Sequence, residues 1–217
     1  MQKNALLLGA TGLVGSTLLT KLLDSSRYNS VTILIRRPIE LQHPKLNQHV
    51  ISFDDLLSNP EKLKPYFQVD DIYCCLGTTM KIAKTHDNFK KIDFDYPLRA
   101  AKLGKEMGAS CFVLNSSVGA DASASSFYLK TKGELEQAIK NLKYKKFSVV
   151  RPSFLMGERA LRRSGEELAI ALLNPIRKLM LGTLKKYRPT DCQDVANAML
   201  DLASQTNVQA AFEVEQF

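Results

Sequence analysis

The chain has 217 residues, 45% of them hydrophobic, and a formal net charge of +8. This length suits one globular domain with a substantial core, and no apolar run reaches the 18 residues that a membrane span needs. The positive charge is spread along the chain without aromatic stacking platforms or a helix-turn-helix pattern, so we expect no nucleic-acid partner.

The compartment and the metal content are predicted from the N-terminus and the cysteines. The opening "MQKNALLLGATGLVG" turns from a short apolar run directly into a glycine loop, unlike a secretory signal, so we expect a cytoplasmic protein. None of the four cysteines has C-x-x-C spacing and no histidine cluster accompanies them, so we expect no metal site. They are Cys74, Cys75, Cys111 and Cys192.

Apolar, β-branched runs alternate with helical patterns along the chain. Several runs are apolar at nearly every position, as in strands that are buried on both faces. This alternation predicts an α/β fold, a doubly wound parallel sheet with helices on both faces, in a single domain spanning 1–217. The expected strands are 4–10, 31–37, 49–53, 71–77, 111–117 and 147–152, with an edge strand in 210–217, and the main helices are 13–24, 93–107 and 127–141.

The region 153–207 is richer in helix than the rest. One helix is expected to start at Ser164 and to break or kink at Pro175. Another is expected to start at Thr190, where Gln193 completes a capping-box pattern. The region is too short for an independent domain, so we expect a small cap on the substrate side of a cleft.

A glycine loop, "GATGLVG", lies between the first expected strand and the first helix. In that context Gly9 permits a tight turn, Gly12 permits close approach of the backbone to a pyrophosphate, and Gly15 permits close packing of helix and strand. The helix N-terminus then presents amides to the phosphates. The loop residues that we expect to contact a dinucleotide are Gly9, Thr11, Gly12, Leu13, Val14 and Gly15.

The end of the second strand selects the type of dinucleotide. An NAD-binding fold usually has an acidic residue there for the ribose 2′-hydroxyl, whereas this chain has Arg36 and Arg37. Because a guanidinium pairs well with a 2′-phosphate, the sequence predicts NADP (NADPH) as cofactor. Further cofactor contacts are expected at the ends of the third and fourth strands, from Asp54, Leu76, Gly77 and Thr78.

A serine, a tyrosine and a lysine follow the fifth strand in an order that makes chemical sense. Tyr128 and Lys132 are one helical turn apart, so the ammonium can favour the phenolate and also hold the nicotinamide ribose. Tyr128 is then the acid/base, and the hydroxyl of Ser116 or Ser117 holds the substrate oxygen. Neighbours on a strand face opposite ways, so the sequence alone leaves open which serine is catalytic, and Ser116 is also expected near the cofactor.

With "CCLGTT", "SSVGAD" and "YLKTKGELE" in this order, the chain resembles the short-chain dehydrogenase/reductase superfamily, over most of residues 4–155. More narrowly it is similar to the atypical group that includes Tat-interacting proteins and bacterial NAD(P)-binding oxidoreductases. The resemblance implies a Rossmann-like fold and catalytic roles for Ser117, Tyr128 and Lys132. Among the departures from the family pattern, no asparagine in 93–107 supplies the fourth polar residue that many members use.

Two functions follow as expectations. The first is an NADP-dependent oxidoreductase that transfers hydride between nicotinamide and a small carbonyl or alcohol substrate. The alternative is an NADP(H)-sensing regulatory protein with little turnover, which the resemblance to Tat-interacting proteins supports. A protein partner fits the second function, and the sequence leaves the oligomeric state open between monomer and homodimer.

Overall fold

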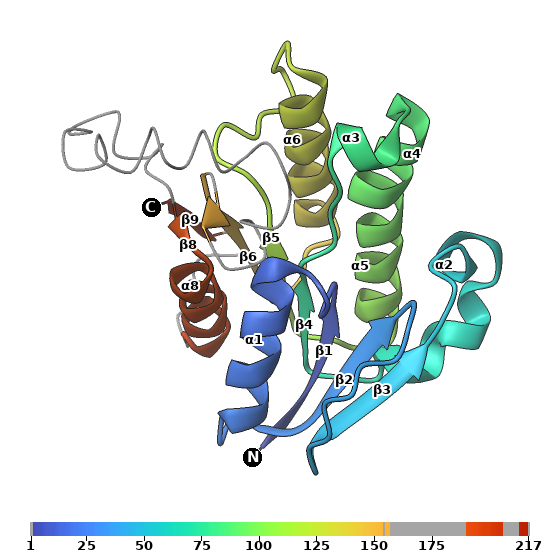
Figure 1. Ribbon diagram of the computed structural model, residues 1–217, viewed down its shortest axis with the longest axis vertical. Coiled ribbons are helices and arrows are strands. Elements are labelled where there is room, and N and C mark those ends of the chain that lie inside the picture. The colour runs from blue at the N-terminus through green and yellow to red at the C-terminus, as the bar shows by residue number, and fades with distance from the viewer. Residues whose placement is uncertain (1, 154, 157–189, 206–212, 217) are drawn as a thin grey trace.

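The computed structural model describes residues 2–153, 155–156, 190–205 and 213–216. Its main sheet has seven strands within these ranges, in the order β3-β2-β1-β4-β5-β6-β9 (Figure 1). All six pairings in the sheet are parallel, as predicted. The strands are β1 (Lys3–Leu8), β2 (Tyr28–Ile35), β3 (Leu46–Val50), β4 (Asp71–Cys74), β5 (Cys111–Asn115), β6 (Lys146–Arg151) and β9 (Glu213–Gln216).

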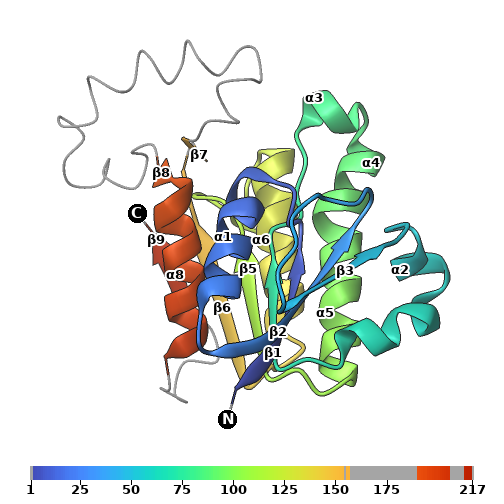
Figure 2. The same cartoon turned by 60° about the horizontal axis from the view of Figure 1, so that its bottom comes forward.

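Helices cover both faces of this sheet (Figure 2). On one face α1 (Leu13–Asp24) packs beside α8 (Cys192–Ser204), and on the other lie α5 (Tyr96–Glu106) and α6 (Phe127–Lys140). In the described part of the chain, no helix is both long enough and apolar enough to cross a bilayer. The short elements are α2 (Asp55–Ser58), η1 (Pro60–Phe67), α3 (Met80–Ala83), α4 (His86–Lys90), the π-helical turn η2 (Lys91–Asp95), β7 (Leu155–Met156) and β8 (Thr190–Asp191).

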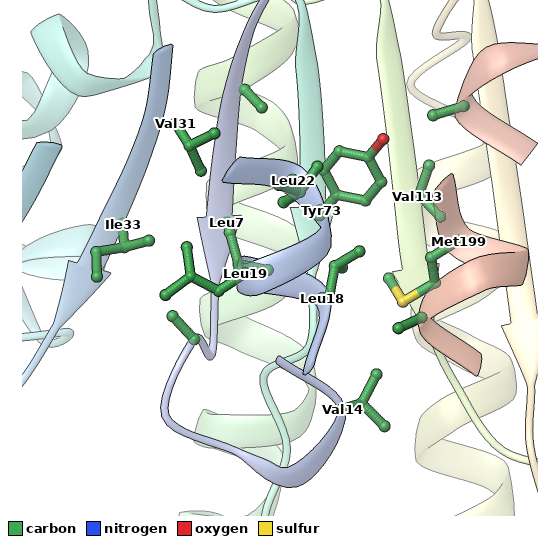
Figure 3. Close-up of a cluster of buried hydrophobic side chains, with 14 of the residues drawn as sticks. Leu7, Val14, Leu18, Leu19, Leu22, Val31, Ile33, Tyr73, Val113 and Met199 are labelled. Carbon is green, nitrogen blue, oxygen red and sulfur yellow. The ribbon is translucent and has the colours of Figure 1, made fainter. Parts of the chain in front are cut away.

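The central strand β1 explains why the apolar runs are continuous. Leu7 faces the cluster beneath α1 and α8, whereas Leu6 and Leu8 face the cluster beneath α5 and α6, and all three are fully buried. Figure 3 shows Leu7 among side chains of α1, together with Tyr73, Val113 and Met199. A strand with helices on both sides needs apolar residues at successive positions, so the run of leucines is a direct consequence of the two-layer covering.

The boundaries of several elements differ from the prediction, and two of the differences have a clear physical reason. The third strand covers Leu46–Val50 rather than 49–53, because its alternating polar positions belong to a sheet edge and the apolar run marks only its end. The predicted helix 93–107 begins instead as a π-helical turn at Lys91–Asp95 and continues as α5. The change from α-helical to π-helical hydrogen bonding does not alter the spacing of apolar residues enough to be recognised in the sequence.

The described part of the C-terminal region contributes a helix to one layer of the fold. Residues 192–204 form α8, which packs against α1 and the sheet and so belongs to a helical layer. The helix cap is Asp191, whose Oδ1 accepts a hydrogen bond from the Gln193 amide at 2.8 Å, and Thr190 lies instead in β8. The helix predicted from Ser164 and the break at Pro175 lie outside the described residues.

A buried carboxylate joins three elements at the amino ends of the strands. Asp71, fully buried at the start of β4, pairs through Oδ1 with Lys3 Nζ and through Oδ2 with Arg27 Nη2, each at 2.8 Å. Tyr28 Oη donates to the same Oδ2 at 2.7 Å. Arg27 also donates to the carbonyl of Ala203 at 2.7 Å. Asp71 thus ties the sheet to the end of α8.

We expect Asp71→Ala to lower the free energy of unfolding by about 2–4 kcal/mol, because it leaves two cations and a buried hydroxyl without their acceptor. Urea unfolding measures this change. Asp24→Asn, an exposed carboxylate at the end of α1, is the matched control and should change stability little. Equal stability of the two variants would contradict a structural role for Asp71.

Candidate functional site

The glycine loop brings the start of α1 against the end of β1. Gly9 has φ +83°, and a Cβ there would lie 2.5 Å from the carbonyl oxygen of Cys75. A Cβ on Gly15 would lie 2.0 Å from the carbonyl oxygen of Gly9. No side chain fits at either position, so these glycines are required for the close approach of helix, strand and the neighbouring loop after β4.

The first turn of α1 carries free amides. The helix cap, Gly12, has no side chain to accept from them, and the first turn contains no acidic residue. The first intrahelical bond of this turn runs from the Ser16 amide to the Gly12 carbonyl, so the amides of residues 13–15 have no intrahelical acceptor. Val14 has its side chain in the core, which leaves only its backbone for a ligand. Anions bind at such helix ends because the partial charges there are positive.

Two exposed arginines directly follow β2, which is the neighbour of β1 in the sheet; β1 leads into the glycine loop. Arg36 and Arg37 make no hydrogen bond or ion pair with any residue that the structure describes. Asp54, predicted to meet the adenine, is held by the protein itself: its Oδ1 pairs with Lys91 Nζ at 2.5 Å and accepts from Tyr96 Oη. These bonds lower the pKa of Asp54, first through the Lys91 hydrogen bond and then through Tyr96.

The loop after β4 runs directly over a buried charge. Leu76 is half-buried and Gly77 is exposed. The Thr78 amide donates to Oδ2 of Asp93 at 2.8 Å. Asp93 lies on η2 and is fully buried. Sequence analysis did not identify Asp93, because a lone aspartate in a helical pattern carries no signal until the π-helical turn points it inward.

Lys132 is the second half of this buried pair. Its Nζ lies 2.7 Å from Oδ1 of Asp93, and the two side chains are 5% and 1% exposed. Burial alone favours the neutral amine, but the negative charge of Asp93, and next Tyr128, outweigh it and raise the pKa of Lys132 above its usual value. The lysine is therefore a buried ammonium one helical turn from Tyr128, as the spacing predicts.

Tyr128 lies at the start of α6 among aromatic side chains. Its ring meets Phe89 of α4 edge-on, with centroids 5.7 Å apart, and the adjacent Phe127 stacks on His86 at 4.0 Å. Tyr128 is partly exposed, so these aromatic contacts hold its ring without burying the residue.

The two serines after β5 have different surroundings. Ser116 is buried and its Oγ donates to Oε1 of Glu136 on α6. Glu136 in turn pairs with Nη2 of Arg151 at the end of β6. Ser117 is partly exposed and its Oγ makes only a 3.3 Å bond to the carbonyl of Val118. Ser116 is thus committed to the protein interior, whereas Ser117 retains an accessible hydroxyl.

One further polar group at this edge was not singled out from the sequence. The amide oxygen of Asn115, the last residue of β5, is buried without a hydrogen-bond partner among the described residues. Such an oxygen at the carboxyl end of a parallel strand suits a ligand or water donor. No group of three or more potential metal ligands occurs in the described ranges.

Known proteins resemble this chain in sequence. Residues 9–206 match the sequence family described as NAD(P)H-binding. Protein HTATIP2 of Rattus norvegicus is 39% identical over 171 residues, which cover 77% of this chain and 69% of the rat protein. Protein FMP52, mitochondrial, of Candida albicans is 36% identical over 199 residues, covering 91% of this chain and 86% of the fungal protein.

Solved structures share the fold at low identity. The Bordetella bronchiseptica enzyme WbmH, solved with NAD⁺, superposes with a TM-score of 0.73 at 15% identity, covering all of this chain and 76% of that one. The likeness supports a Rossmann-like fold, as the sequence predicts.

The predicted cytoplasmic location is wrong on these findings. The protein of Candida albicans and further fungal relatives are named mitochondrial. The prediction depended only on the lack of a secretory pattern at the N-terminus, which does not distinguish between the remaining compartments.

The contrast between the serines gives a stability prediction. Ser116→Ala should lower the free energy of unfolding by about 1.5–3 kcal/mol, because a buried carboxylate oxygen loses a hydroxyl donor. Ser117→Ala should change it little, since that hydroxyl is bonded weakly and is accessible. Urea unfolding of both variants tests this, and a larger loss for Ser117→Ala would reverse the assignment of the two hydroxyls.

Proposed function

Because the chain belongs to the NAD(P)H-binding family, we propose that it is an NADP-dependent oxidoreductase acting on a small carbonyl or alcohol substrate. The observation that carries the proposal is the buried ammonium of Lys132, one turn from the accessible phenol of Tyr128. Both lie on α6, whose preceding strand β5 ends at the same edge of the sheet as the glycine loop.

The residues at this edge fit a dinucleotide. The open amides of residues 13–15 suit a pyrophosphate, and a Cβ on Gly12 would meet only the Gly9 carbonyl, at 3.3 Å, so the backbone there is accessible. When bound, the nicotinamide supplies or accepts the hydride. The chain's own contribution is to bind and orient it and to manage the proton.

The proton is assigned to Tyr128. In the reducing direction its Oη donates to the substrate oxygen, while Ser117 Oγ donates a hydrogen bond to that same oxygen. The positive charge of Lys132 then stabilises the phenolate that remains. Ser117 is preferred to Ser116 because the latter's hydroxyl is already bonded to Glu136.

The preference for the phosphorylated cofactor is supported by charge. Arg36 and Arg37 are exposed, lack partners among the described residues, and follow the strand next to β1. A 2′-phosphate supplies the acceptor that two such guanidinium groups need.

A second candidate function is an NADP(H)-sensing regulatory protein with little turnover. The ion pair between Lys132 and Asp93 favours it, because an ammonium that a carboxylate already neutralises helps a phenol less than a free one does. The accessible phenol and hydroxyl of Tyr128 and Ser117 favour catalysis, since a sensor has no chemical need for them.

We expect NADPH to bind about tenfold to a hundredfold more tightly than NADH, the worth of charged hydrogen bonds to the 2′-phosphate. Arg36→Ala should remove most of this difference and leave NADH affinity nearly unchanged. Isothermal titration calorimetry with both cofactors measures the four affinities.

The control for this titration is Lys102→Ala, which removes an exposed cation on α5, on the other face of the sheet. It should preserve the preference for NADPH. Equal affinities for NADPH and NADH in the unaltered protein would refute the assignment of the two arginines.

We expect Tyr128→Phe to reduce kcat by about 10²–10⁴-fold and to leave NADPH affinity unchanged, because only the proton donor is lost and the ring still packs on Phe89. Steady-state kinetics with a panel of aldehydes, ketones and quinones measures this effect.

Tyr66→Phe removes a hydroxyl from a ring on η1 that packs against His49, with centroids 4.3 Å apart, and serves as the matched control. If Tyr128→Phe retains full turnover, the catalytic role is rejected. Tight NADPH binding without turnover of any substrate favours the sensor function instead.

A further inference from the structure

Asp93 occupies an unusual position beside the catalytic candidates. It is fully buried on η2, which packs against both α5 and α6. Its two carboxylate oxygens have different partners: Oδ1 meets Lys132 Nζ at 2.7 Å, and Oδ2 accepts from the Thr78 amide at 2.8 Å. One carboxylate therefore connects helix α6 to the loop after β4.

Stability alone does not account for this pair. Removing two charges from water is costly, and replacement of a buried ion pair by apolar side chains of similar size is often neutral or stabilising. If this position served only to pack the interior, apolar side chains would do so at a lower cost in free energy. Local π-helical turns, such as the one that carries Asp93, occur frequently at functional sites.

The loop passes over the pair at short range. A Cβ on Gly77 would lie 3.4 Å from Asp93 Oδ1 and 3.6 Å from Lys132 Nζ. Gly77 is itself exposed, so the accessible backbone of this loop lies directly against the buried ion pair. The position of this backbone depends on the adjacent Thr78 amide, which Asp93 holds.

We propose that Asp93 is a positioning residue. Its carboxylate holds the Lys132 ammonium at the distance needed by Tyr128, and holds the loop 76–78 in the position that contacts the cofactor. This inference rests on the proposed function.

The decisive variant is Asp93→Glu, which keeps the charge and adds one methylene. If the carboxylate only neutralises the charge of Lys132, an aspartate and a glutamate serve equally well. If it positions the ammonium and the loop, they do not, since a displacement near 1 Å can cost about a hundredfold in rate.

Three quantities are measured on the full chain: the melting temperature, the Kd for NADPH from nicotinamide fluorescence, and kcat and KM for an active carbonyl substrate. For Asp93→Glu we expect a melting temperature near that of the unaltered protein. We also expect an NADPH Kd raised about tenfold and a kcat lowered about tenfold to a hundredfold, with a smaller change in KM for the carbonyl substrate.

Asp93→Asn is the second variant, of the same shape without the charge, and should show losses at least as large in NADPH affinity. Asp95→Asn, on the same turn and with no ion pair among the described residues, is the control and should match the unaltered protein.

The outcomes separate the two proposals. If the unaltered protein fails to bind NADPH, the proposed function falls and the role of Asp93 falls with it. If it binds NADPH and Asp93→Glu matches it in Kd and kcat, only the role of Asp93 is rejected. If neither Asp93 variant folds, Asp93 is a folding residue and positioning is likewise rejected.

Discussion

The strand order of the sheet reverses at β1, and this reversal determines on which side of β1 each of the other strands lies. From β1 the sheet runs to β2 and β3 on one side and to β4, β5 and β6 on the other, so the connections after β1 and β4 lead in opposite directions. Ligands of open α/β sheets bind at such a switch point. The parallel arrangement then directs the carboxyl ends of all these strands to one edge. The glycine loop, the arginines after β2, the loop 76–78 and the serines after β5 therefore lie along this edge, although they are far apart in the sequence.

Buried charges on α6 connect this edge to the interior. Tyr128, Lys132 and Glu136 follow one another at intervals of four residues and therefore share one face of the helix. Lys132 pairs with Asp93, and Glu136 pairs with Arg151 while accepting from Ser116. The two charged side chains on this face pair with residues of different elements. These ion pairs fix the rotation of α6 about its axis and its position along that axis. The phenol at its exposed end is held in place by the same contacts.

The parts of the fold that follow from local periodicity were predictable. Helix 13–24 matches the structure because its apolar spacing is a local property of the sequence. The glycine loop matches because Gly9 and Gly15 are required by close contacts within and beside the loop itself. Asp93 was not predictable, because its importance comes from a π-helical turn and from a lysine elsewhere in the chain. The edge strand β3 was displaced for a related reason, since polar side chains on a sheet edge hide its periodicity. Sequence left two serines as candidates, and only the tertiary contact of Ser116 with Glu136 separates them.

We propose that one edge of the sheet holds a phosphorylated dinucleotide, with its nicotinamide end at Lys132 and its adenosine end at Arg36. A crystal structure of the chain with NADPH is the sharpest test. We expect a ribose hydroxyl within hydrogen-bond distance of Lys132 Nζ, the 2′-phosphate against Arg36, and the ion pair between Lys132 and Asp93 intact. A nucleotide bound with its nicotinamide away from α6, or with the 2′-phosphate facing solvent beyond reach of both arginines, would contradict it.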